Sequence, residues 1–292
     1  MRAGYAAIVG RPNVGKSTLL NHLLGQKISI TSRRPQTTRH RILGISNGSG
    51  FQIMYVDTPG LHHAGQRAIN KYMNRAATSA MSDVDVLIFV VEGLYWTEQD
   101  DYVLEKIKAL KAPVILVLNK SDRIPDKTAL LPHIQKLSEK MKFAHIIPLS
   151  ARTGDNQAAL EEAVKNLLPE GVALYPEDQI TDRSERFMAA EFVREKLMRS
   201  TGQEVPYAAT VEIEKFTHQR DVLHIHAVIW VEREGQKAII IGDKGERLKS
   251  IGTQARIEME RMFEYKVFLQ LLVRVKEGWS DDARVMARMG YE

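Results

Sequence analysis

The feature that most constrains the fold of this 292-residue chain is a glycine-rich segment near its start, which reads Gly10-Arg11-Pro12-Asn13-Val14-Gly15-Lys16-Ser17. It matches the pattern G-x-x-x-x-G-K-[ST]. An apolar run over residues 5–9 precedes it and predicts a buried strand, and residues 17–24 predict the helix that follows. A strand, a phosphate-binding loop and a helix in this order predict an α/β domain with a doubly wound, mostly parallel sheet.

The residues of this loop have separate predicted roles. Gly10 and Gly15 let backbone amides point inward at phosphate oxygens, and the helix that starts near Lys16 adds the positive end of its dipole. We expect Lys16 to neutralise the β- and γ-phosphates and Ser17 to offer its hydroxyl to Mg²⁺. The predicted nucleotide contacts cover Gly10, Arg11, Pro12, Asn13, Val14, Gly15, Lys16, Ser17 and Thr18.

A second motif, Asn119-Lys120-Ser121-Asp122, predicts which base is bound. It follows the apolar run 114–118 and so lies at the carboxyl end of a strand, where doubly wound sheets bind ligands. The carboxylate of Asp122 can accept from both the N1 hydrogen and the exocyclic amine of guanine, and adenine offers the opposite pattern. Asn119 and Lys120 are expected to brace the loop and flank the base. The predicted ligands are therefore GTP and GDP.

A third motif, Asp57-Thr58-Pro59-Gly60, ends the apolar run 51–56. All four residues are predicted nucleotide contacts. Asp57 is expected to hold Mg²⁺, usually through water, and Gly60 to free its amide for the γ-phosphate. The polar segment over residues 33–41 is suited to ordering only when a γ-phosphate and Mg²⁺ are present. One of its two threonines, Thr37 or Thr38, should reach the metal.

Composition bounds the class of protein. The chain is long enough for two modest cores, since 44% of its residues are hydrophobic. It contains no cysteine, which excludes disulfides and thiolate-metal sites and favours a reducing compartment. The first predicted strand begins almost at residue 1, so we expect no signal peptide, and the apolar runs are too short to span a membrane. A cytoplasmic location is expected.

The pattern of predicted elements divides the chain. We place a GTP-binding domain over residues 1–168, a linker over residues 169–180, where Pro169, Gly171 and Pro176 interrupt the apolar pattern, and a second domain over residues 181–292. In the second domain the periodicity predicts the order α-β-β-α-α-β. Inside its strand patterns, Trp230 and Phe268 are expected to be core residues.

The segment Gly242-Asp243-Lys244-Gly245 falls between the two later helices, an arrangement that resembles the bacterial, type II form of the KH domain. In that α+β fold the glycines let the loop approach the sugar-phosphate backbone of RNA, and Lys244 supplies charge. Residues 239–241 are expected to line the floor on which bases rest. The predicted RNA contacts are Lys237, Ile241, Gly242, Asp243, Lys244, Gly245, Arg247 and Lys249.

Net charge does not by itself predict RNA binding by the second domain. The chain has a formal net charge of +5. Residues 1–179 carry 22 Lys and Arg against 17 Asp and Glu, whereas residues 180–292 carry 19 of each. A local basic face around the G-x-x-G segment is what remains, and the arginines of residues 33–41 are as readily solvated as bound to RNA.

With these motifs the chain resembles the Era family of bacterial GTPases, within the larger class of translation-factor-like GTPases. The resemblance covers essentially the whole chain. It is carried by the wording of the phosphate-binding loop, of Gln36-Thr37-Thr38-Arg39, of residues 57–60, and of residues 175–182 and 242–249. It implies a GTPase with slow intrinsic turnover that binds the 3′ end of 16S ribosomal RNA and assists maturation of the small (30S) ribosomal subunit. It also implies a looser peripheral contact with the inner membrane, and we expect a monomer.

The family pattern adds residue roles. It favours Thr38 over Thr37 as the metal contact, and it identifies Ser150-Ala151 as a further guanine-site motif in which a backbone amide meets the guanine carbonyl. Lys16, Thr38 and Gly60 are then the catalytic candidates. Leu61 stands where many small GTPases have the glutamine that orients water, so K⁺ held by Asn13 is a candidate activator.

Two other functions stay open. A tRNA-modifying GTPase would need a modification domain around its GTP-binding domain, and we expect no such segment before Met1. A signalling GTPase of the membrane surface would need no RNA-binding domain, but no basic amphipathic helix or lipidation motif stands out. Cross-linking to RNA would separate these functions.

Overall fold

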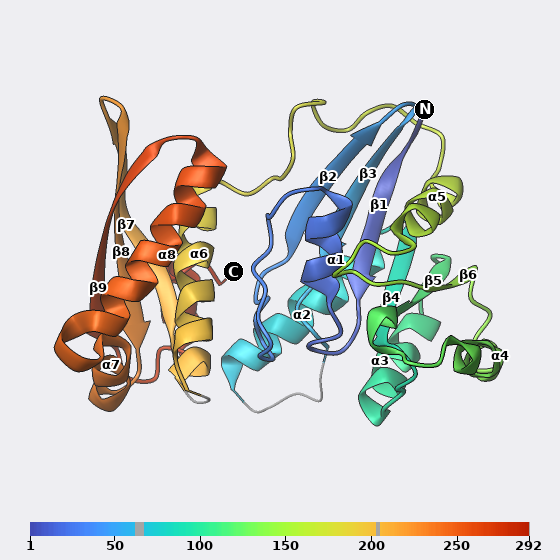
Figure 1. Ribbon diagram of the computed structural model, residues 1–292, viewed down its shortest axis with the longest axis horizontal. Coiled ribbons are helices and arrows are strands. Elements are labelled where there is room, and N and C mark those ends of the chain that lie inside the picture. Colours follow the sequence, from blue (N-terminus) through green and yellow to red (C-terminus); the bar gives the residue numbers. More distant parts are fainter. Residues whose placement is uncertain (62–66, 203–204, 292) are drawn as a thin grey trace. The chain divides into compact units, whose positions relative to one another are not determined.

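The structure is a computed structural model that describes residues 1–61, 67–202 and 205–291. Contacts divide the chain into two units, which Figure 1 shows as separate sheets with their helices. The first comprises Met1–Gly65 and Met73–Asp182, and the second comprises Gln66–Tyr72 and Arg183–Glu292. The predicted fold class, an α/β domain followed by a smaller α+β domain, is confirmed.

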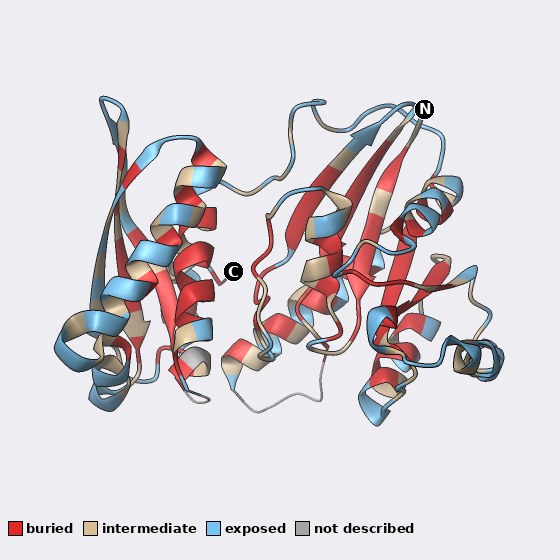
Figure 2. Cartoon of the chain, viewed as in Figure 1, coloured by how far each residue is buried: buried red, intermediate tan, exposed pale blue. Residues whose placement is uncertain are grey.

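The first unit is built on a six-stranded sheet in the order β2-β3-β1-β4-β5-β6. Neighbouring strands run parallel except β2, which pairs antiparallel with β3. The central strands are nearly continuous apolar runs because helices cover both faces of a parallel sheet, and Figure 2 shows them as buried. The strands are β1 (Arg2–Val9), β2 (Ile42–Gly48), β3 (Phe51–Asp57), β4 (Val86–Glu92), β5 (Val114–Asn119) and β6 (His145–Pro148).

The helices of this unit connect the strands so that the carboxyl ends of the parallel strands meet at one edge. They are α1 (Lys16–Leu23), α2 (Ala68–Ser82), α3 (Glu98–Lys108), α4 (Leu130–Ser138) and α5 (Gln157–Leu167). The first residues of α2, up to Tyr72, are assigned to the second unit. The three predicted nucleotide motifs follow β1, β3 and β5, and therefore lie along this edge. No helix within the described residues is long and apolar enough to cross a membrane.

The second unit contains a three-stranded sheet in the order β7-β8-β9, with β7 antiparallel and β9 parallel to β8. Helix α8 buries Ile251, Ala255, Met259 and Phe263 at four-residue spacing, which is one face of a helix. The elements are α6 (Glu185–Ser200), β7 (Thr210–Gln219), β8 (Val222–Val231), α7 (Glu234–Ile241), α8 (Glu246–Phe263), β9 (Lys266–Val275) and a terminal α9 (Ala283–Arg288). The predicted order is confirmed.

The segment that we expected to be a linker is held by the first unit. The Ile45 backbone N–H donates to the Ile180 carbonyl at 2.8 Å, and the Thr181 hydroxyl donates to the Leu43 carbonyl at 2.6 Å. The side-chain oxygen of Gln52 accepts from the backbone N–H groups of residues 174 and 175. Residues 174–181 thus lie along β2 and β3, and the contact-defined units divide between residues 182 and 183.

Candidate nucleotide site and nucleic-acid groove

The loop after β1 has the backbone conformation that its glycines allow. Gly10 (φ 151°), Asn13 (φ 65°) and Gly15 (φ 102°) all have positive φ. Residues other than Gly, Asn and Asp seldom adopt this backbone conformation. A Cβ on Gly10 would lie 2.4 Å from the carbonyl oxygen of Val90. Gly15 is the N-cap of α1, so the loop delivers the helix N-terminus to the pocket.

Lys16 is buried at the start of α1. Its ammonium donates to the carbonyl oxygens of Gly10 at 3.0 Å and of Arg11 at 2.9 Å, across the mouth of the loop. Burial lowers the pKa of Lys16 to about 8, although the nearby Asp57 raises it. A desolvated cation held in this way gains a strong partner when phosphate oxygens enter.

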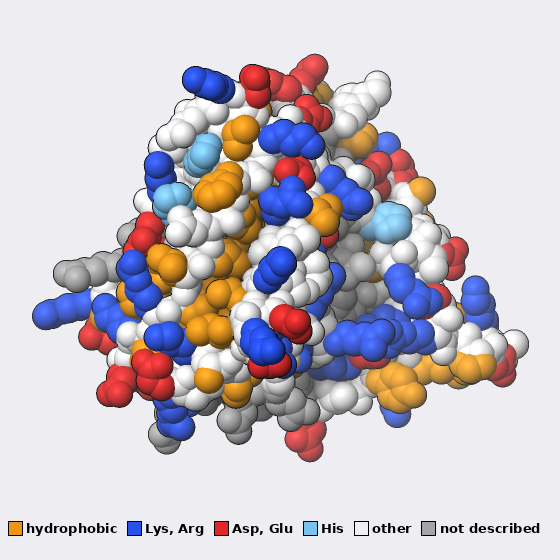
Figure 3. All heavy atoms as spheres, turned by 60° about the vertical axis from the view of Figure 1, so that its left-hand side comes forward, with side chains coloured by type: hydrophobic (Ala, Val, Ile, Leu, Met, Phe, Trp, Pro, Cys, Tyr) orange, Lys and Arg blue, Asp and Glu red, His pale blue; other side chains and the backbone are white. Residues whose placement is uncertain are grey.

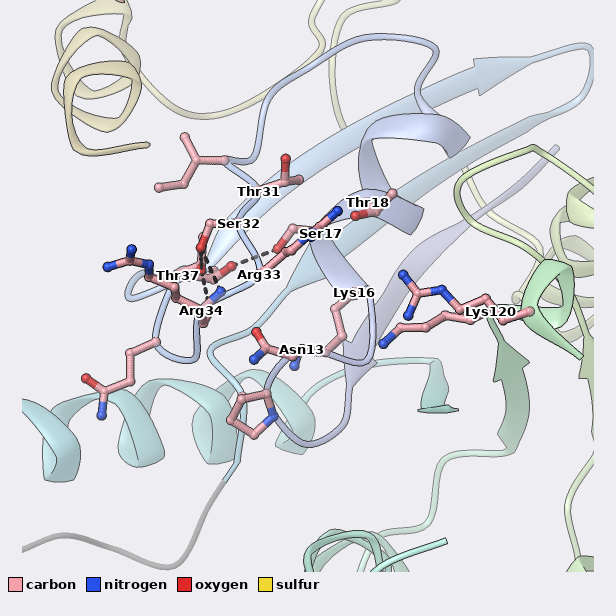
Figure 4. A pocket seen from close by; sticks show the side chains of 17 residues that line it. Asn13, Lys16, Ser17, Thr18, Thr31, Ser32, Arg33, Arg34, Thr37 and Lys120 are labelled. Atoms are coloured by element: carbon pink, nitrogen blue, oxygen red, sulfur yellow. Dashed lines mark hydrogen bonds between the residues drawn. The ribbon is translucent and has the colours of Figure 1, made fainter. Parts of the chain in front are cut away.

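A pocket of about 500 Å³ opens above this loop. Figure 4 shows Lys16 and Ser17 on one side of it, with side chains of residues 31–37 facing them. The lining combines the loop, the polar segment before β2 and the start of the base motif, and its residues are Pro12, Asn13, Gly15, Lys16, Ser17, Thr18, Ile30, Thr31, Ser32, Arg33, Arg34, Gln36, Thr37, Thr38, Gly60, Lys120 and Arg123.

Three predicted metal contacts converge beside the pocket. The Ser17 hydroxyl donates to Oδ2 of Asp57 at 2.6 Å, and it lies 2.7 Å from the Thr38 hydroxyl. The Thr37 hydroxyl instead donates to the Arg34 carbonyl. Oδ1 of Asp57 is buried and has no hydrogen-bond partner among the described residues. Hydroxyls and a carboxylate are the ligands that Mg²⁺ prefers, so these residues fit the ion.

The Asp57 carboxylate is fully buried, and burial raises its pKa. Hydrogen bonds from Ser17 and Ser29 and the positive charge of Lys16 oppose that shift. The neighbouring hydroxyl of Thr58 is turned away from the pocket, because it donates to the Ile8 carbonyl at 2.9 Å. Thr58 therefore fastens the end of β3 to β1, and its hydroxyl is not directed at a nucleotide.

Gly60 and Leu61 pack against the phosphate-binding loop. A Cβ on Gly60 would come within 2.7 Å of the backbone nitrogen of Pro12, so only glycine fits this approach. The Leu61 N–H donates to the Gly10 carbonyl at 3.2 Å, and its side chain is completely buried. Leu61 is a core residue and, having no polar group, cannot orient water.

The base motif is bonded directly to the phosphate-binding loop. Asn119 donates from its side-chain nitrogen to the Val14 carbonyl at 2.7 Å. Its side-chain oxygen accepts from the backbone N–H groups of Lys120 and Ala151. A Cβ on Gly15 would lie 2.3 Å from that side-chain nitrogen. Asn119 thus ties three loops together, and the Ala151 amide already has a partner within the protein.

Asp122 is held as a hydrogen-bond acceptor. Ser150 donates to Oδ1 at 2.7 Å, and the exposed Arg152 guanidinium lies 2.7 Å from Oδ2. The Ser150 hydrogen bond lowers the pKa of Asp122, and the charge of Arg152 acts in the same direction. The ionised carboxylate is the form that could accept from guanine.

Sequence reasoning missed the acidic residues that anchor both loops. Glu92 lies 2.8 Å from the Lys120 ammonium and 3.5 Å from the Arg11 guanidinium, whose Nε is 3.2 Å from the buried Asp100. Burial raises the pKa of Glu92, but the Lys120 hydrogen bond and the positive charges of Lys120, Arg11 and Arg123 together outweigh burial and lower the pKa. The side chain of Arg11 is therefore used within the protein. The sequence did contain a signal for Glu92, because this carboxylate ends the apolar run 86–91. The end of that run lies at the edge of the sheet where the nucleotide motifs meet.

In the second unit the predicted G-x-x-G loop forms a single tight turn. Gly242 (φ 73°), Lys244 (φ 45°) and Gly245 (φ 82°) have positive φ, and Gly245 is the N-cap of α8. A Cβ on Gly242 would lie 2.7 Å from the Cβ of Arg247, whereas nothing lies within 4 Å of a Cβ on Gly245. The loop is therefore closed toward the protein at Gly242 and open at Gly245.

A groove of about 360 Å³ adjoins this loop, between α8 and β9. Its apolar residues are Leu248, Leu269 and Leu271, and its other lining residues are Gly245, Lys249, Gly252, Thr253 and Arg256. In Figure 3, where this unit comes forward, hydrophobic side chains form a band bordered by lysines and arginines. An apolar floor beside a glycine loop and cations suits single-stranded nucleic acid.

Two predictions about this unit were wrong. Ile240 cannot form part of a floor for bases, because it is fully buried, whereas Ile239 on the same helix α7 is 44% exposed. Phe268 is not a core residue but is 51% exposed. It pairs with His224 across the sheet, on the face opposite Leu269, since neighbouring residues of a strand point to opposite faces.

The other predicted RNA contacts have different surroundings. Asp243, Lys244 and Lys249 are exposed at or beside the loop. The Lys237 ammonium lies 3.7 Å from Glu234, and the Arg247 guanidinium donates to the Ile239 carbonyl. Arg247 therefore closes the end of α7 and brings its charge to the loop at the same time.

The comparisons with known proteins agree with this division. A family model described as a 50S ribosome-binding GTPase matches residues 5–120, and a KH domain model matches residues 204–280. The GTPase Era of Marinobacter nauticus is 61% identical over 289 residues, covering 99% of this chain and 95% of that protein. The GTPase Era of Pseudomonas fluorescens is 59% identical over 290 residues, covering 99% and 97%.

Two solved structures resemble the whole chain at 41% identity and a TM-score of 0.97, covering 100% of this chain and 99% of each neighbour. One is an Aquifex aeolicus Era variant bound to GDP·AlF4⁻. The other is Era in complex with MgGDPNP and nucleotides 1506–1542 of 16S ribosomal RNA. One neighbour thus holds a magnesium nucleotide and RNA together.

Proposed function

This chain belongs to the Era family of GTPases, and from that membership we propose that it is a GTP-hydrolysing switch that binds the 3′ end of 16S ribosomal RNA and assists assembly of the small ribosomal subunit. The observation that carries the proposal is the convergence of Ser17, Thr38 and Asp57 beside the loop that places Lys16. This arrangement serves a magnesium nucleoside triphosphate. Asp122, held by Ser150, adds the guanine preference.

The proposed reaction is transfer of the γ-phosphoryl group to water. Water attacks the γ-phosphorus, the bond to the β–γ bridging oxygen breaks, and GDP and phosphate are released. When bound, Mg²⁺ neutralises charge on the β- and γ-oxygens, and we assign Ser17, Thr38 and Asp57 to hold it. Lys16 and the loop amides stabilise the same charge, and Gly60 presents its amide to the γ-phosphate.

The guanine assignment is tested by Asp122→Asn. The substitution exchanges an acceptor for a donor at the base edge, so preference should move from GTP toward XTP by about 100-fold, or about 2.7 kcal/mol. Competition between the two nucleotides at fixed Mg²⁺ measures the shift. Glu105→Gln, an exposed carboxylate change on α3 in the same unit, is the control and should leave GTP preference intact. Full GTP preference in folded Asp122→Asn protein would remove Asp122 from the base site.

We assign Asn13 to a monovalent cation beside the phosphates. Asn13 is exposed, lines the pocket and has positive φ, so its side chain can turn toward the nucleotide without altering the loop. Since Leu61 cannot orient water, the proposal gives K⁺ the charge-stabilising task. Hydrolysis should be faster in KCl than in NaCl, and Asn13→Ala should abolish the difference. Equal rates of the unchanged protein in both salts would contradict it.

For RNA we assign the loop 242–245 and the groove beside it. The two glycines permit close approach of the backbone, Lys244 and Lys249 supply charge to phosphates, and Leu269 and Leu271 offer an apolar surface to bases. Lys237, Ile241, Asp243 and Arg247 border this region and complete the proposed contact set. The Era complex with 16S ribosomal RNA supports this choice of ligand.

The remaining assignments concern the whole molecule. We propose that residues 1–168 act as the GTP-binding domain, residues 169–180 as the connection, and residues 181–292 as the RNA-binding domain. We further propose a cytoplasmic monomer with peripheral contact to the inner membrane. Size-exclusion chromatography with light scattering and flotation with anionic vesicles test the last two statements.

A further inference from the structure

One hydroxyl at the metal site belongs to none of the motifs. Ser29 is fully buried, and its hydroxyl donates to Oδ2 of Asp57 at 2.9 Å. The same oxygen accepts from Ser17 at 2.6 Å. Oδ2 thus has two donors, while Oδ1 is buried and has no hydrogen-bond partner among the described residues. One oxygen of this carboxylate therefore accepts from two protein donors, and the other is still able to accept a hydrogen bond.

The position of Ser29 is fixed by a second residue. Asn21 accepts through its side-chain oxygen from the backbone N–H groups of Ile28 at 3.0 Å and Ser29 at 2.9 Å, and it donates to the Ser29 carbonyl at 2.7 Å. Asn21 lies four residues after Ser17 on α1, so both side chains leave the same face of the helix. The helix that carries Ser17 therefore also sets the place of Ser29.

We propose that Ser29 is a positioning residue for magnesium binding: its hydroxyl, placed by the backbone that Asn21 holds, fixes the Asp57 carboxylate and leaves Oδ1 available for the hydrated ion. The proposal rests on the GTPase function proposed above. Groups that orient a metal-binding carboxylate typically contribute 10- to 100-fold to metal affinity without touching the metal.

A purely structural role for Ser29 makes a different prediction. If the hydroxyl only satisfied a buried group, its loss would lower stability and weaken nucleotide binding alike with and without Mg²⁺. If it positions Asp57, the loss falls on the magnesium-dependent part of binding alone. The metal-free nucleotide complex separates the two, because Lys16 and the loop amides still bind phosphate there.

The experiment follows release of a fluorescent GDP analogue from the full chain as Mg²⁺ is titrated. Ser29→Ala should raise the Mg²⁺ concentration needed for half-maximal retention by at least about tenfold, with GDP affinity in EDTA within about twofold of the unchanged protein. Ser29→Cys keeps the size of the side chain but donates weakly. Its Mg²⁺ requirement should therefore lie between those of Ser29→Ala and the unchanged protein. Ser46→Ala on β2 is the matched serine deletion outside the site and should behave as the unchanged protein.

Each outcome decides the matter. An unchanged Mg²⁺ requirement in folded Ser29→Ala protein would overturn the proposal, and so would an equal loss of affinity in EDTA and in Mg²⁺. Failure of the unchanged protein to bind any guanine nucleotide would overturn the proposed function and, with it, this role of Ser29.

Discussion

The nucleotide loop and the RNA loop use the same local device in opposite surroundings. Each is a short segment with three positive-φ residues that ends in a glycine N-cap, Gly15 before α1 and Gly245 before α8. A Cβ on Gly15 would strike the side-chain nitrogen of Asn119 at 2.3 Å, whereas a Cβ on Gly245 meets nothing within 4 Å. The first loop is locked by the fold around it, and the second is open to an incoming chain.

The lysines of the two loops differ in the same way. Lys16 is buried with its ammonium on two backbone carbonyls, while Lys244 is exposed. Burial makes the charged form of a lysine less favourable in the empty pocket, and a bound phosphate makes it more favourable. The free energy of a buried cation therefore changes strongly when the pocket is filled. An exposed cation contributes a salt-dependent attraction that does not depend on fine geometry. Nucleotide binding should therefore respond to small steric changes, and RNA binding mainly to charge.

The largest expected effect is that of Gly15→Ala. The methyl group must displace Asn119, and it also places a side chain at positive φ, which costs roughly 1–2 kcal/mol. With the lost Asn119 hydrogen bond, roughly 1–3 kcal/mol, GTP affinity should fall by about 100-fold or more. Titration with a fluorescent GTP analogue measures it, while affinity for a 16S ribosomal RNA 3′ fragment should be unchanged.

Gly25→Ala is the matched control for that change. Gly25 has φ 67° and open space around its Cβ position, so the substitution brings backbone strain without a collision. Thermal unfolding should register the strain, and GTP affinity should stay within about twofold. If both variants lose GTP affinity equally, strain alone would explain the result, and the contact between Gly15 and Asn119 would carry no special weight.

The next effect is that of Gly245→Asp in the open loop. The substitution sets an anion where the RNA backbone should approach, so RNA affinity should fall at least about tenfold, or about 1.4 kcal/mol. GTP affinity should not change. Gly278→Asp is the matched control, because Gly278 also has positive φ (64°) and open surroundings but lies outside the groove.

Both RNA titrations need one stated salt concentration, since phosphate contacts weaken with salt. Retained RNA affinity in folded Gly245→Asp protein would show that this loop does not bind RNA and would break the comparison between the two loops.

The smallest expected effect is the pH dependence of GTP binding. Because the pKa of Lys16 is lowered to about 8 in the free protein and phosphate favours the charged form, binding takes up a proton above that pH. GTP affinity should then fall about threefold from pH 7.5 to pH 8.5 and stay nearly level below pH 7. Calorimetry at pH 8.5 in two buffers of different ionisation enthalpy should detect the proton. Absence of proton uptake would mean that the free Lys16 keeps its full charge.

The fold and the nucleotide motifs could be predicted because their signals are local. Gly10 and Gly15 set backbone conformations within a few residues, and the apolar runs 51–56 and 114–118 are long enough to predict buried parallel strands. The α-β-β-α-α-β order of the second unit followed from periodicity in the same way. Each of these features depends on neighbours in the chain, and the sequence states those neighbours directly.

Other features depended on which segments meet. The exposure of Phe268 and the place of Leu269 in the groove depend on which face of β9 the helices cover, and strand alternation alone does not identify that face. Ile240 was expected in the floor for bases because it is apolar and close to Gly242 in sequence, yet α7 turns it into the core. Adjacency in sequence was a poor guide to adjacency at the surface.

By itself, the sequence determined the order of strands and helices, the phosphate-binding loop and the base motif. Only the tertiary structure decided that Ser29 shares Asp57 with Ser17, that Glu92 pairs with Lys120, and that residues 174–181 lie along β2 and β3. The physical reason is range. A backbone conformation or a helix face is set by residues a few positions apart, whereas a hydrogen bond between distant residues exists only after the sheet has brought its strand ends to one edge.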